Sequence, residues 1–460
     1  MRERIKTMPK IIHRTAAALG VASLLAGCSS FLDADKAIKD PNLPSAATRD
    51  QLFVGAQANV FAQQEGPLAM IVCQWMQQCS GINGRFVQQQ DSYSVNAGTF
   101  DQPFQEVYSA GGLVALRTVQ ESAEATGDLP YKGIAQVLEA LLVGTTASIW
   151  GNIPYSEAVG DDPTPAFDDQ MAVYASLQTL LDEAITNIQG AGEGPGGVDL
   201  FHGGAELPWI QAAYTLKARY HLHTAEVLGA AAYTAARAAA LQGISAPAND
   251  LRTAHTSVTS ERNMWTQFQN TSGFGLDLVA GARLVNLMES PQHNDPRLPE
   301  YFGENQNGGY GGFDVTTGTT PGEEISPLAG SGRHADDFRQ PIVTWEENQL
   351  ILAETNFRLS GIAAAQPFLN NVRLARGKTI VPATLQAIME EKYVALFQNI
   401  EVWNDWKRTC FPALTPALGE TAIPRRLYYG QTEEQTNDNT PSSDEQNIFT
   451  IPNPNDPNAC

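Results

Sequence analysis

The sequence is poor in positive charge. Among its 460 residues are 29 Lys and Arg against 50 Asp and Glu, which gives a formal net charge of −21. Because binding to a phosphate backbone needs a surface rich in Lys and Arg, this balance argues against a nucleic-acid partner. Charged residues make up 17% of the chain and hydrophobic residues 43%. These shares are typical of a globular protein rather than a disordered one.

The chain also lacks the local patterns that mark most catalytic and metal sites. It has no CxxC pair, no zinc-ligand spacing and no GxSxG motif. His221 and His223 are two residues apart, so on a helix they point to different faces. No pair of acids stands out as a glycosidase pair, and Glu390-Glu391 is expected to belong to a polar helix face. We therefore expect no enzyme activity, no cofactor and no metal ligands, with a secreted glycoside hydrolase as the less favoured alternative.

The first 27 residues have the form of a secretory signal peptide. Five Lys and Arg residues precede the apolar run AAALGVASLLAG, which is too short to span a membrane stably. The run ends in LAGC, which resembles the lipobox of bacterial lipoproteins, where the Cys receives the lipid, including palmitate. We expect lipidation at Cys28, an outer-membrane location because Ser29 rather than Asp follows, and a tether over 28–46. An ordinary signal peptide is the alternative.

Beyond the N-terminus, no segment reaches about 18 consecutive apolar residues, so we expect the body of the protein to lie outside the membrane. Four further cysteines follow, and an exported protein can form disulfides. Cys73 and Cys79 can pair only if the helix predicted around them stops before Cys79, because six helical residues rise about 9 Å. Cys410 and Cys460 would join the two ends of a Pro- and Asn-rich tail. Both pairings stay open from the sequence.

Hydrophobic residues recur at helical spacing through much of the chain. The predicted helices fall in pairs of antiparallel-capable length, which favours a mostly α fold, a tetratricopeptide-like superhelix within one domain over 47–460. We assign the scaffold to 47–243 and 346–410, a loop-rich insertion with short strands to 244–345, and a C-terminal segment to 411–460. The predicted helices cover 47–64, 68–78, 104–125, 133–150, 174–188, 209–228, 231–241, 346–360, 363–376 and 385–406.

Six motifs, in order, resemble those of the SusD/RagB-like outer-membrane lipoproteins. The motifs are WGNIPYSEA (150–158), Trp209 with Lys217 and Arg219, NDPRLP (294–299), TWEENQLILAETNFR (344–358), EKYVALF with EVWNDWKRT (391–409), and IPRRLY (423–428). Cys410 departs from the usual Gly. The resemblance implies a surface lid over a SusC-like TonB-dependent transporter, which binds a nutrient, usually a glycan, and closes on loading without catalysis. The same role for peptides is the alternative.

A sugar site needs aromatic rings for stacking and polar side chains for the hydroxyl groups. Two zones are rich in both, the loop 80–103 and the insertion, which also contain Phe86 and Phe313. The alternative for each aromatic is core packing, which we weigh most heavily for Trp75. The predicted ligand residues are Trp75, Asn83, Arg85, Tyr93, Trp265 and Tyr310.

The motif residues themselves are interpreted as structural. WGNIPYSEA follows a predicted helix, and its Gly and Pro favour a turn into extended backbone. The aromatic and basic residues near 403–426 are expected to join the C-terminal segment to the scaffold, with Glu157, Glu354 and Glu401 as partners for the arginines. The predicted structural residues are Pro154, Tyr155, Glu157, Trp403, Trp406, Arg408 and Arg425.

Overall fold

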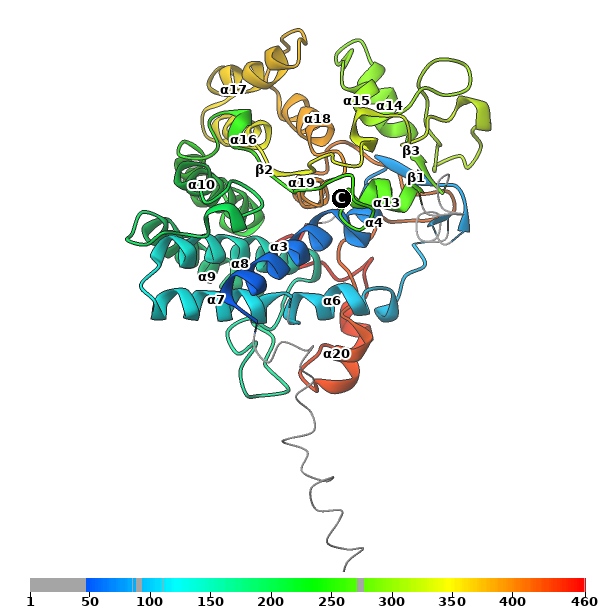
Figure 1. The fold of residues 1–460 in the computed structure, drawn as a ribbon. Coiled ribbons are helices and arrows are strands. Elements are labelled where there is room, and N and C mark those ends of the chain that lie inside the picture. The colour runs from blue at the N-terminus through cyan, green and yellow to red at the C-terminus, as the bar shows by residue number, and fades with distance from the viewer. Residues whose placement is uncertain (1–46, 85, 88–92, 110, 271–276, 459) are drawn as a thin grey trace, which may run out of the picture. The chain divides into compact units, whose positions relative to one another are not determined.

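The protein is mostly α-helical, as the hydrophobic periodicity predicts (Figure 1). The computed structural model describes residues 47–84, 86–87, 93–109, 111–270, 277–458 and 460. The signal peptide, Cys28 and the tether lie outside the described residues, and so does Arg85. Residues Arg49–Cys460 form one compact unit.

The first half of this unit contains most of the long helices. Several begin at recognisable signals: Pro is the first or second residue of α4 and α8, and the Asp169 side chain caps α9 by accepting hydrogen bonds from the backbone of Met171 and Ala172. The helices are α3 (Arg49–Glu65), α4 (Pro67–Trp75), α6 (Asp101–Tyr108), α7 (Leu113–Ala125), α8 (Leu129–Trp150), α9 (Gln170–Ile188), α10 (Glu206–His223), α11 (Ala225–Leu228) and α12 (Ala230–Ala240).

The second half alternates short and long helices. Thr344 and Thr384 cap α16 and α18 through their side-chain oxygens. These helices are α13 (Met264–Asn270), α14 (Ala282–Glu289), α15 (Leu298–Tyr301), α16 (Trp345–Ser360), α17 (Ile362–Ala375), α18 (Leu385–Ala395), α19 (Glu401–Thr409) and α20 (Gln431–Thr436).

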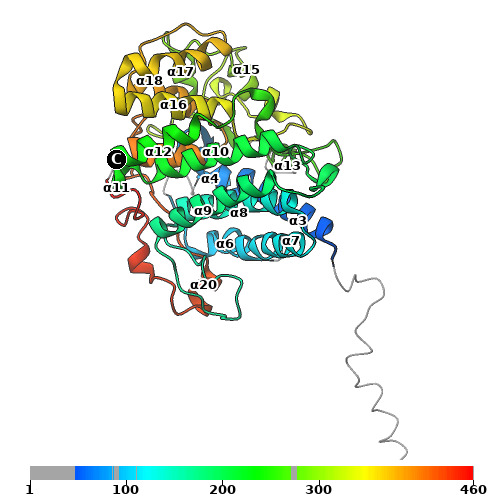
Figure 2. The same cartoon turned by 90° about the vertical axis from the view of Figure 1, so that its left-hand side faces the viewer.

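The long helices stack in successive layers (Figure 2). Along the stack α7 packs on α8, α8 on α9, α9 on α10, α10 on α12, α12 on α16, and α16 on α17. This pairwise stacking confirms the predicted tetratricopeptide-like scaffold. α8 contacts α3, α6, α7, α9, α10 and α19; it is apolar and long enough to cross a membrane, but 94% of its most apolar window is buried inside the protein. It is therefore a core helix.

Two glycines allow the neighbours of α8 to approach closely. A Cβ atom on Gly133 would lie 2.7 Å from the carbonyl oxygen of Ala184 in α9. A Cβ atom on Gly144 would lie 2.2 Å from the ring of Tyr220 in α10, whose hydroxyl donates to the Ala140 carbonyl at 2.8 Å. The bare backbone of α8 at these positions thus sets the spacing of three helices.

Two short antiparallel ladders hold the insertion, one to the scaffold and one between its own two ends. Strand β1 (Cys79–Gly81) pairs with β3 (Leu278–Ala280), and β2 (Leu251–Arg252) pairs with β4 (Pro341–Val343). The insertion therefore contains short strands, as expected, together with the short helices α13, α14 and α15. Through β1 it is bonded to the loop that follows α4.

Four of the predicted helices are divided or end early. Those over 104–125 and 209–228 are divided into α6 and α7 and into α10 and α11. The helix expected over 385–406 is broken into α18 and α19, because Gln398 adopts a φ of +63° and the Asn399 side chain accepts a hydrogen bond from the backbone of Glu401. The helix expected over 68–78 ends at Trp75, which brings Cys79 back toward Cys73. Cys73–Cys79 and Cys410–Cys460 both form disulfides, each with a Cα–Cα distance of 5.2 Å.

Candidate functional site

A cavity of about 670 Å³ opens where α3, α4, α6 and α13 meet. We call it the α6 cavity. It exceeds the cavities beside α14 and beside Trp345, of about 380 and 420 Å³. Its apolar wall comes mainly from α4, with single side chains from α13 and the loop after β1. The residues lining it are Ala62, Gln63, Pro67, Leu68, Met70, Ile71, Phe86, Asn96, Gly98, Thr99, Gln102, Pro103, Glu106 and Met264.

A chain of polar side chains crosses the opposite wall of the α6 cavity. Gln102 donates to one carboxylate oxygen of Glu106 at 2.7 Å. Gln63, which is buried, donates to the carbonyl oxygen of Pro103 at 3.2 Å and faces the second Glu106 oxygen at 3.4 Å. Amides and a carboxylate opposite an apolar wall can hold a ligand that has both hydroxyl groups and apolar faces.

The two zones selected from the sequence meet at this cavity. Phe86 and Asn96 come from the loop 80–103, and Met264 comes from the insertion. The ring of Phe86 contacts that of Phe268 in α13 edge-on, with centroids 5.1 Å apart. The β1–β3 ladder fixes the loop against the insertion a few residues away. Segments about 170 residues apart in the chain are thus held in one wall.

Three of the predicted ligand residues lie in the core and do not line the α6 cavity. Trp75 is fully buried, edge-on to Trp403 with ring centroids 5.4 Å apart. Tyr93 packs against Trp75, and its hydroxyl accepts a hydrogen bond from the backbone of Ala417 at 3.1 Å. Trp265 is 3% exposed. For Trp75 this is the core packing that the sequence analysis weighed most heavily.

Two further predicted ligand residues lie nearer the surface, and Arg85 is outside the described residues. Asn83 is exposed, and Tyr310 is half-buried, where partial desolvation and the charge of Glu304 raise its pKa. The sequence analysis did not single out Gln63, Gln102, Glu106 or Met264. A signal for Gln63 was available, since it follows Val60 by three residues, on the face of α3 that the periodicity buries.

The WGNIPYSEA turn is held by hydrogen bonds inside the fold. The carboxylate of Asp168 accepts from the backbone of Tyr155 at 2.9 Å and of Ser156 at 2.8 Å. The Tyr155 hydroxyl contacts Glu139 at 3.2 Å, and Pro154 is buried. Glu157 accepts from the backbone of Ala166 at 3.1 Å. Glu157 therefore closes its own loop and pairs with none of the arginines proposed for it.

The cluster around α19 joins the C-terminal segment to the scaffold. Arg408 forms a bidentate ion pair with the buried Glu354, with one of the two contacts at 2.8 Å. Burial alone would raise the pKa of Glu354, but the positive charge of Arg408 lowers it. Trp403 donates from its ring nitrogen to the carbonyl of Pro424 at 3.1 Å. Arg425 donates to the carbonyl of Asp456 at 3.0 Å. Trp406 is buried beside them.

Glu401 was expected to pair with one of the arginines near 408–426. It instead lies 2.8 Å from the imidazole of His223, and its carboxylate is 3.8 Å from Arg219. Arg219 itself is paired with Glu347 at 2.6 Å. The scaffold motif of Trp209, Lys217 and Arg219 thus contributes its arginine to a buried charge cluster between α10, α16 and α19.

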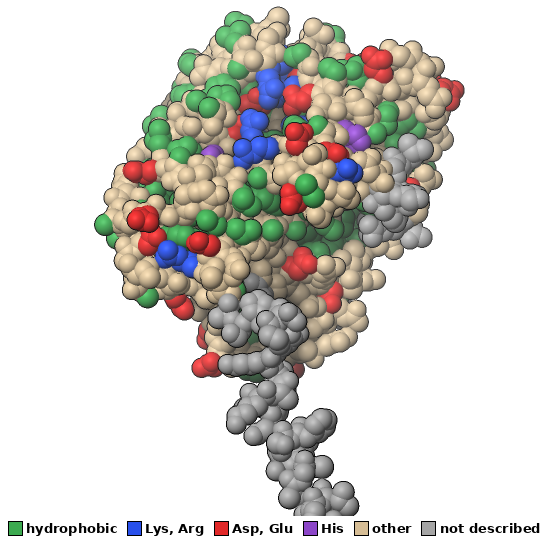
Figure 3. Space-filling view, viewed as in Figure 1, with side chains coloured by type: hydrophobic (Ala, Val, Ile, Leu, Met, Phe, Trp, Pro, Cys, Tyr) green, Lys and Arg blue, Asp and Glu red, His purple; other side chains and the backbone are tan. Residues whose placement is uncertain are grey.

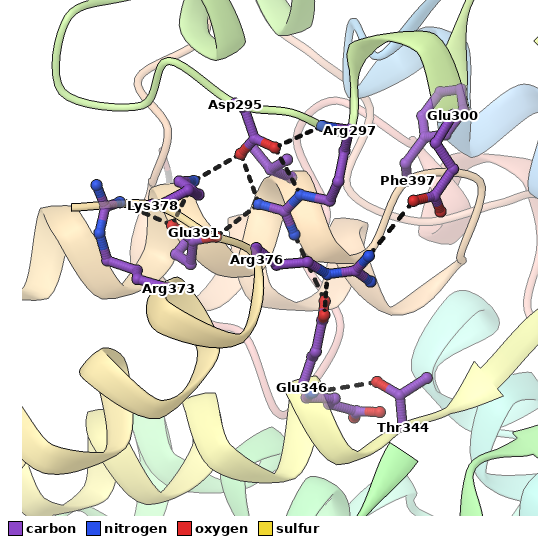
Figure 4. Close-up of polar contacts among 12 residues, drawn as sticks. Asp295, Arg297, Glu300, Thr344, Glu346, Arg373, Arg376, Lys378, Glu391 and Phe397 are labelled. Atoms are coloured by element: carbon purple, nitrogen blue, oxygen red, sulfur yellow. Dashed lines mark hydrogen bonds and ion pairs between the residues drawn. The ribbon is translucent and has the colours of Figure 1, made fainter. Parts of the chain in front are cut away.

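The NDPRLP motif forms a second buried charge network (Figure 4). Arg297 contacts Asp295 and Glu391, each at 2.6 Å, and Lys378 donates to the same two carboxylates at 2.6 and 2.7 Å. Arg373 donates to Glu391 at 2.8 Å. Glu391 was expected on a polar helix face, but it is buried, and three cations meet it in the core.

A cavity of about 420 Å³ beside Trp345 contains charges of both signs. Figure 3 shows basic and acidic side chains gathered in a hollow near β2 and α18. Of the arginines lining this cavity, Arg252 pairs with Asp250 at 2.6 Å, Arg333 with Glu300 at 3.4 Å, and Arg376 with Glu346. Because these charges neutralise one another, the cavity is a weaker candidate for ligand binding than the α6 cavity.

No metal site is apparent among the residues that the structure describes, since no three His, Cys, Asp or Glu side chains there are arranged to hold an ion. The polar groups of the α6 cavity are amides, a hydroxyl and one carboxylate. Such a set suits hydrogen bonding to a neutral ligand.

Comparisons with known proteins identify the fold and the family. The chain resembles a SusD/RagB family protein from Bacteroides thetaiotaomicron (TM-score 0.71, 17% identity, 88% of this chain and 98% of that one). It also resembles a SusD homologue from Bacteroides uniformis (0.70, 19%, 87% and 97%). A third similar structure is a chitin-binding SusD homologue from Flavobacterium johnsoniae (0.67, 18%, 84% and 93%).

No curated protein matches the sequence. A family model described as starch-binding and associating with the outer membrane matches residues 41–372 and 360–430. The match covers most of the chain and confirms the resemblance read from the six motifs. The chain therefore belongs to the SusD-like family of starch-binding proteins that associate with the outer membrane.

Proposed function

We propose that this protein is a lipoprotein of the outer membrane that binds a glycan in the α6 cavity and delivers it to a SusC-like TonB-dependent transporter. Lipidation at Cys28 would place the folded unit at the cell surface, with 28–46 as its tether. The protein would bind and release its ligand without catalysis.

The observation that carries this proposal is the lining of the α6 cavity. Its apolar wall of Leu68, Met70 and Ile71 faces the hydrogen-bonded row of Gln63, Glu106 and Gln102. A pyranose ring has apolar C–H faces and a rim of hydroxyl groups, so it complements both walls at once. The description of the family as starch-binding, and of one similar structure as chitin-binding, supports the same class of ligand.

The proposal is tested by calorimetric titration of the mature protein with maltoheptaose, chitohexaose and a peptide mixture. Gln102 is exposed, so Gln102→Ala should leave the fold intact while removing a hydrogen-bonding group from the cavity. We expect this variant, and Glu106→Gln, to weaken glycan binding by about tenfold. Gln105→Ala, an exposed amide on the same helix that does not line the cavity, is the matched control.

Unchanged affinity in both α6-cavity variants would exclude this cavity as the site. If the protein binds peptides but not saccharides, the proposed role in delivery to a transporter stands and the ligand is a peptide. The transporter partnership is tested separately, by tagging the protein and identifying whether a TonB-dependent barrel co-purifies from outer membranes.

A further inference from the structure

Two adjoining cavities flank α14, and they share no lining residue with the α6 cavity. One, of about 380 Å³, lies between α14 and α18. The other, of about 220 Å³, lies between α14 and the segments 313–316 and 413–415. Arg283 and Asn286, one helical turn apart, line both cavities. We call the pair of cavities the α14 groove.

Arg283 has no hydrogen-bond partner and no ion pair within the described part of the chain, and its Nε atom is buried without an acceptor. The missing carboxylate partner sets Arg283 apart from Arg297, Arg373 and Arg408, each of which is paired with a buried carboxylate, although the Nε atom of Arg408 also lacks an acceptor among the described residues. A buried donor without a partner costs about 1–3 kcal/mol. Arg283 lines both cavities and its guanidinium has no partner among the described residues, so it can donate hydrogen bonds to a ligand.

An acceptor lies on the α18 side of the groove. Glu390 accepts a hydrogen bond from Gln386 at 2.9 Å, and its second oxygen is 3.7 Å from Nε2 of His293. Lys378 has only donors and lies 3.2 Å from Nδ1 of His293, so that nitrogen accepts and the ring proton sits on Nε2, toward Glu390. Desolvation would raise the pKa of Glu390, but these neighbours and Arg283 outweigh it and lower the pKa. Glu390 is therefore a carboxylate acceptor at neutral pH.

The other side of the groove supplies an aromatic ring. Phe313 is partly exposed and lines the smaller cavity beside Asp314, Thr316 and Thr415. Its position is fixed by the backbone, because the Phe313 N–H donates to the Ala280 carbonyl at 2.9 Å, and its carbonyl accepts from Ala282 at 3.0 Å. In the larger cavity Leu287, Val381 and Pro382 add an apolar surface.

The charges of the groove select a neutral ligand. The positive charge of Arg283 is opposed by Glu390 in one cavity and by Asp314 in the other, while Arg373 at the edge is already paired with Glu391. An acidic sugar would meet two carboxylates with one available cation. A neutral hydroxyl-rich chain can donate to Glu390 and accept from Arg283 and Asn286 without that penalty.

We propose that the α14 groove is a second carbohydrate site, which binds a neutral oligosaccharide with successive sugar units in the two cavities and one ring against Phe313. Arg283 is the central donor of this site. The site is independent of the α6 cavity, so the protein would hold saccharide at two places.

The experiment is calorimetric titration of the mature protein with maltoheptaose, chitohexaose, cellohexaose and oligogalacturonate. The variants are Arg283→Ala, Asn286→Ala, Gln102→Ala and the Arg283→Ala/Gln102→Ala double variant, each with its melting temperature measured. Arg283 has no hydrogen-bond or ion-pair partner among the described residues, and Asn286 is exposed, so we expect neither substitution to lower the melting temperature.

We expect one neutral oligosaccharide to bind at two sites in the wild-type protein. Arg283→Ala and Gln102→Ala should each weaken one site by about tenfold and leave the other unchanged, and the double variant should weaken both sites by about tenfold. Oligogalacturonate should bind no more tightly than the neutral chains. If Arg283→Ala and Asn286→Ala bind as the wild type while Gln102→Ala loses all binding, the second site is overturned and the proposed function stands. The reverse pattern overturns the α6 cavity and keeps the α14 groove. If no saccharide binds the wild-type protein, both are overturned.

Discussion

At the scale of single residues, the family motifs are used to neutralise buried charge. Asp295 and Arg297 of NDPRLP, and Arg408 of EVWNDWKRT, are each less than one-tenth exposed and bonded to partners from distant parts of the chain. A charge removed from water is tolerated only when it is paired and hydrogen-bonded. These motifs therefore mark positions where helices pack in a fixed geometry. The residues that line the α6 cavity and the α14 groove lie outside the motifs.

Asp295→Asn should destabilise the protein in a pH-dependent way. Burial would raise the pKa of Asp295, but hydrogen bonds and charges from Arg297 and Lys378 reverse that effect and lower the pKa. A carboxyl group whose folded-state pKa is depressed stabilises the fold above its unfolded pKa, about 3.9, and loses this contribution as the pH falls through the folded value.

We therefore expect Asp295→Asn to lower the free energy of unfolding by about 3–5 kcal/mol at pH 7, and by less at pH 3. Urea denaturation at the two pH values measures the difference. Asp337→Asn, at an exposed acid, should change little at either pH. If Asp295→Asn lowers the free energy of unfolding equally at pH 3 and pH 7, the ionised carboxylate of Asp295 is not the source of the stabilisation.

Arg408→Ala should lower stability without changing ligand affinity. It would leave Glu354 ionised and unpaired in the core, at a cost of about 3–5 kcal/mol. Arg358→Ala is a matched control, because Arg358 approaches the same carboxylate at 4.0 Å but is partly exposed. Thermal unfolding and glycan titration of the folded fraction test this prediction. Loss of binding at an unchanged melting temperature would show that Arg408 belongs to a ligand site.

At the scale of secondary-structure elements, the helices were the predictable part. Long runs with apolar residues at helical spacing, such as α9 and α16, carry the signal within their own sequence. The break between α18 and α19 was not predictable this way. Its apolar periodicity continues across Gln398, and the break depends on contacts with distant segments, such as the bond from the Gln398 backbone to the Gln78 side chain.

The lining of the candidate site was predictable by zone but not by residue. Composition selected the loop 80–103 and the insertion, and the α6 cavity draws on both. Core packing was weighed most heavily for Trp75, which is buried. The sequence did not show that Tyr93 also packs in the core, or that Met264 and Gln102 line the cavity. That choice depends on how α4, α6 and α13 pack, which no single segment encodes.

The close packing of α8 leads to a prediction about two helical glycines. Gly144→Ala would place a Cβ atom 2.2 Å from the Tyr220 ring, so α10 must shift, and we expect a loss of about 1–3 kcal/mol. Gly55→Ala in α3 is the control: its new Cβ meets no atom within 4 Å, and Ala favours the helix by about 0.5–1 kcal/mol. Chemical denaturation should give Gly55→Ala a higher free energy of unfolding than the wild type, and Gly144→Ala a lower one. Equal stability of the two variants would contradict the spacing role of Gly144.

At the scale of the whole molecule, the C-terminal segment closes the described unit onto the centre of its scaffold. The Tyr429 hydroxyl donates to the carbonyl of Asn152 at 2.7 Å, and Asn453 donates to that of Ser148 at 3.0 Å. Asn455 donates to the carbonyl of His223, and Cys460 is bonded to Cys410. The turn that follows α8 is thus covered by the last residues of the chain, which explains why WGNIPYSEA has a structural role.

The division between this unit and the N-terminal segment leads to the last prediction. Residues Arg49–Cys460 account for the compact unit, so lipidation at Cys28 should decide location and leave folding unchanged. We expect cells that express the wild-type protein with labelled palmitate to label it, and Cys28→Ser to abolish the label and the accessibility of the protein to protease at the cell surface. Cys460→Ser, which removes a different cysteine, should keep the label. Because one acyl chain binds a membrane only marginally, stable anchoring needs the several chains of a lipoprotein. Palmitate that persists in Cys28→Ser would place the lipid elsewhere and remove the basis for the tether.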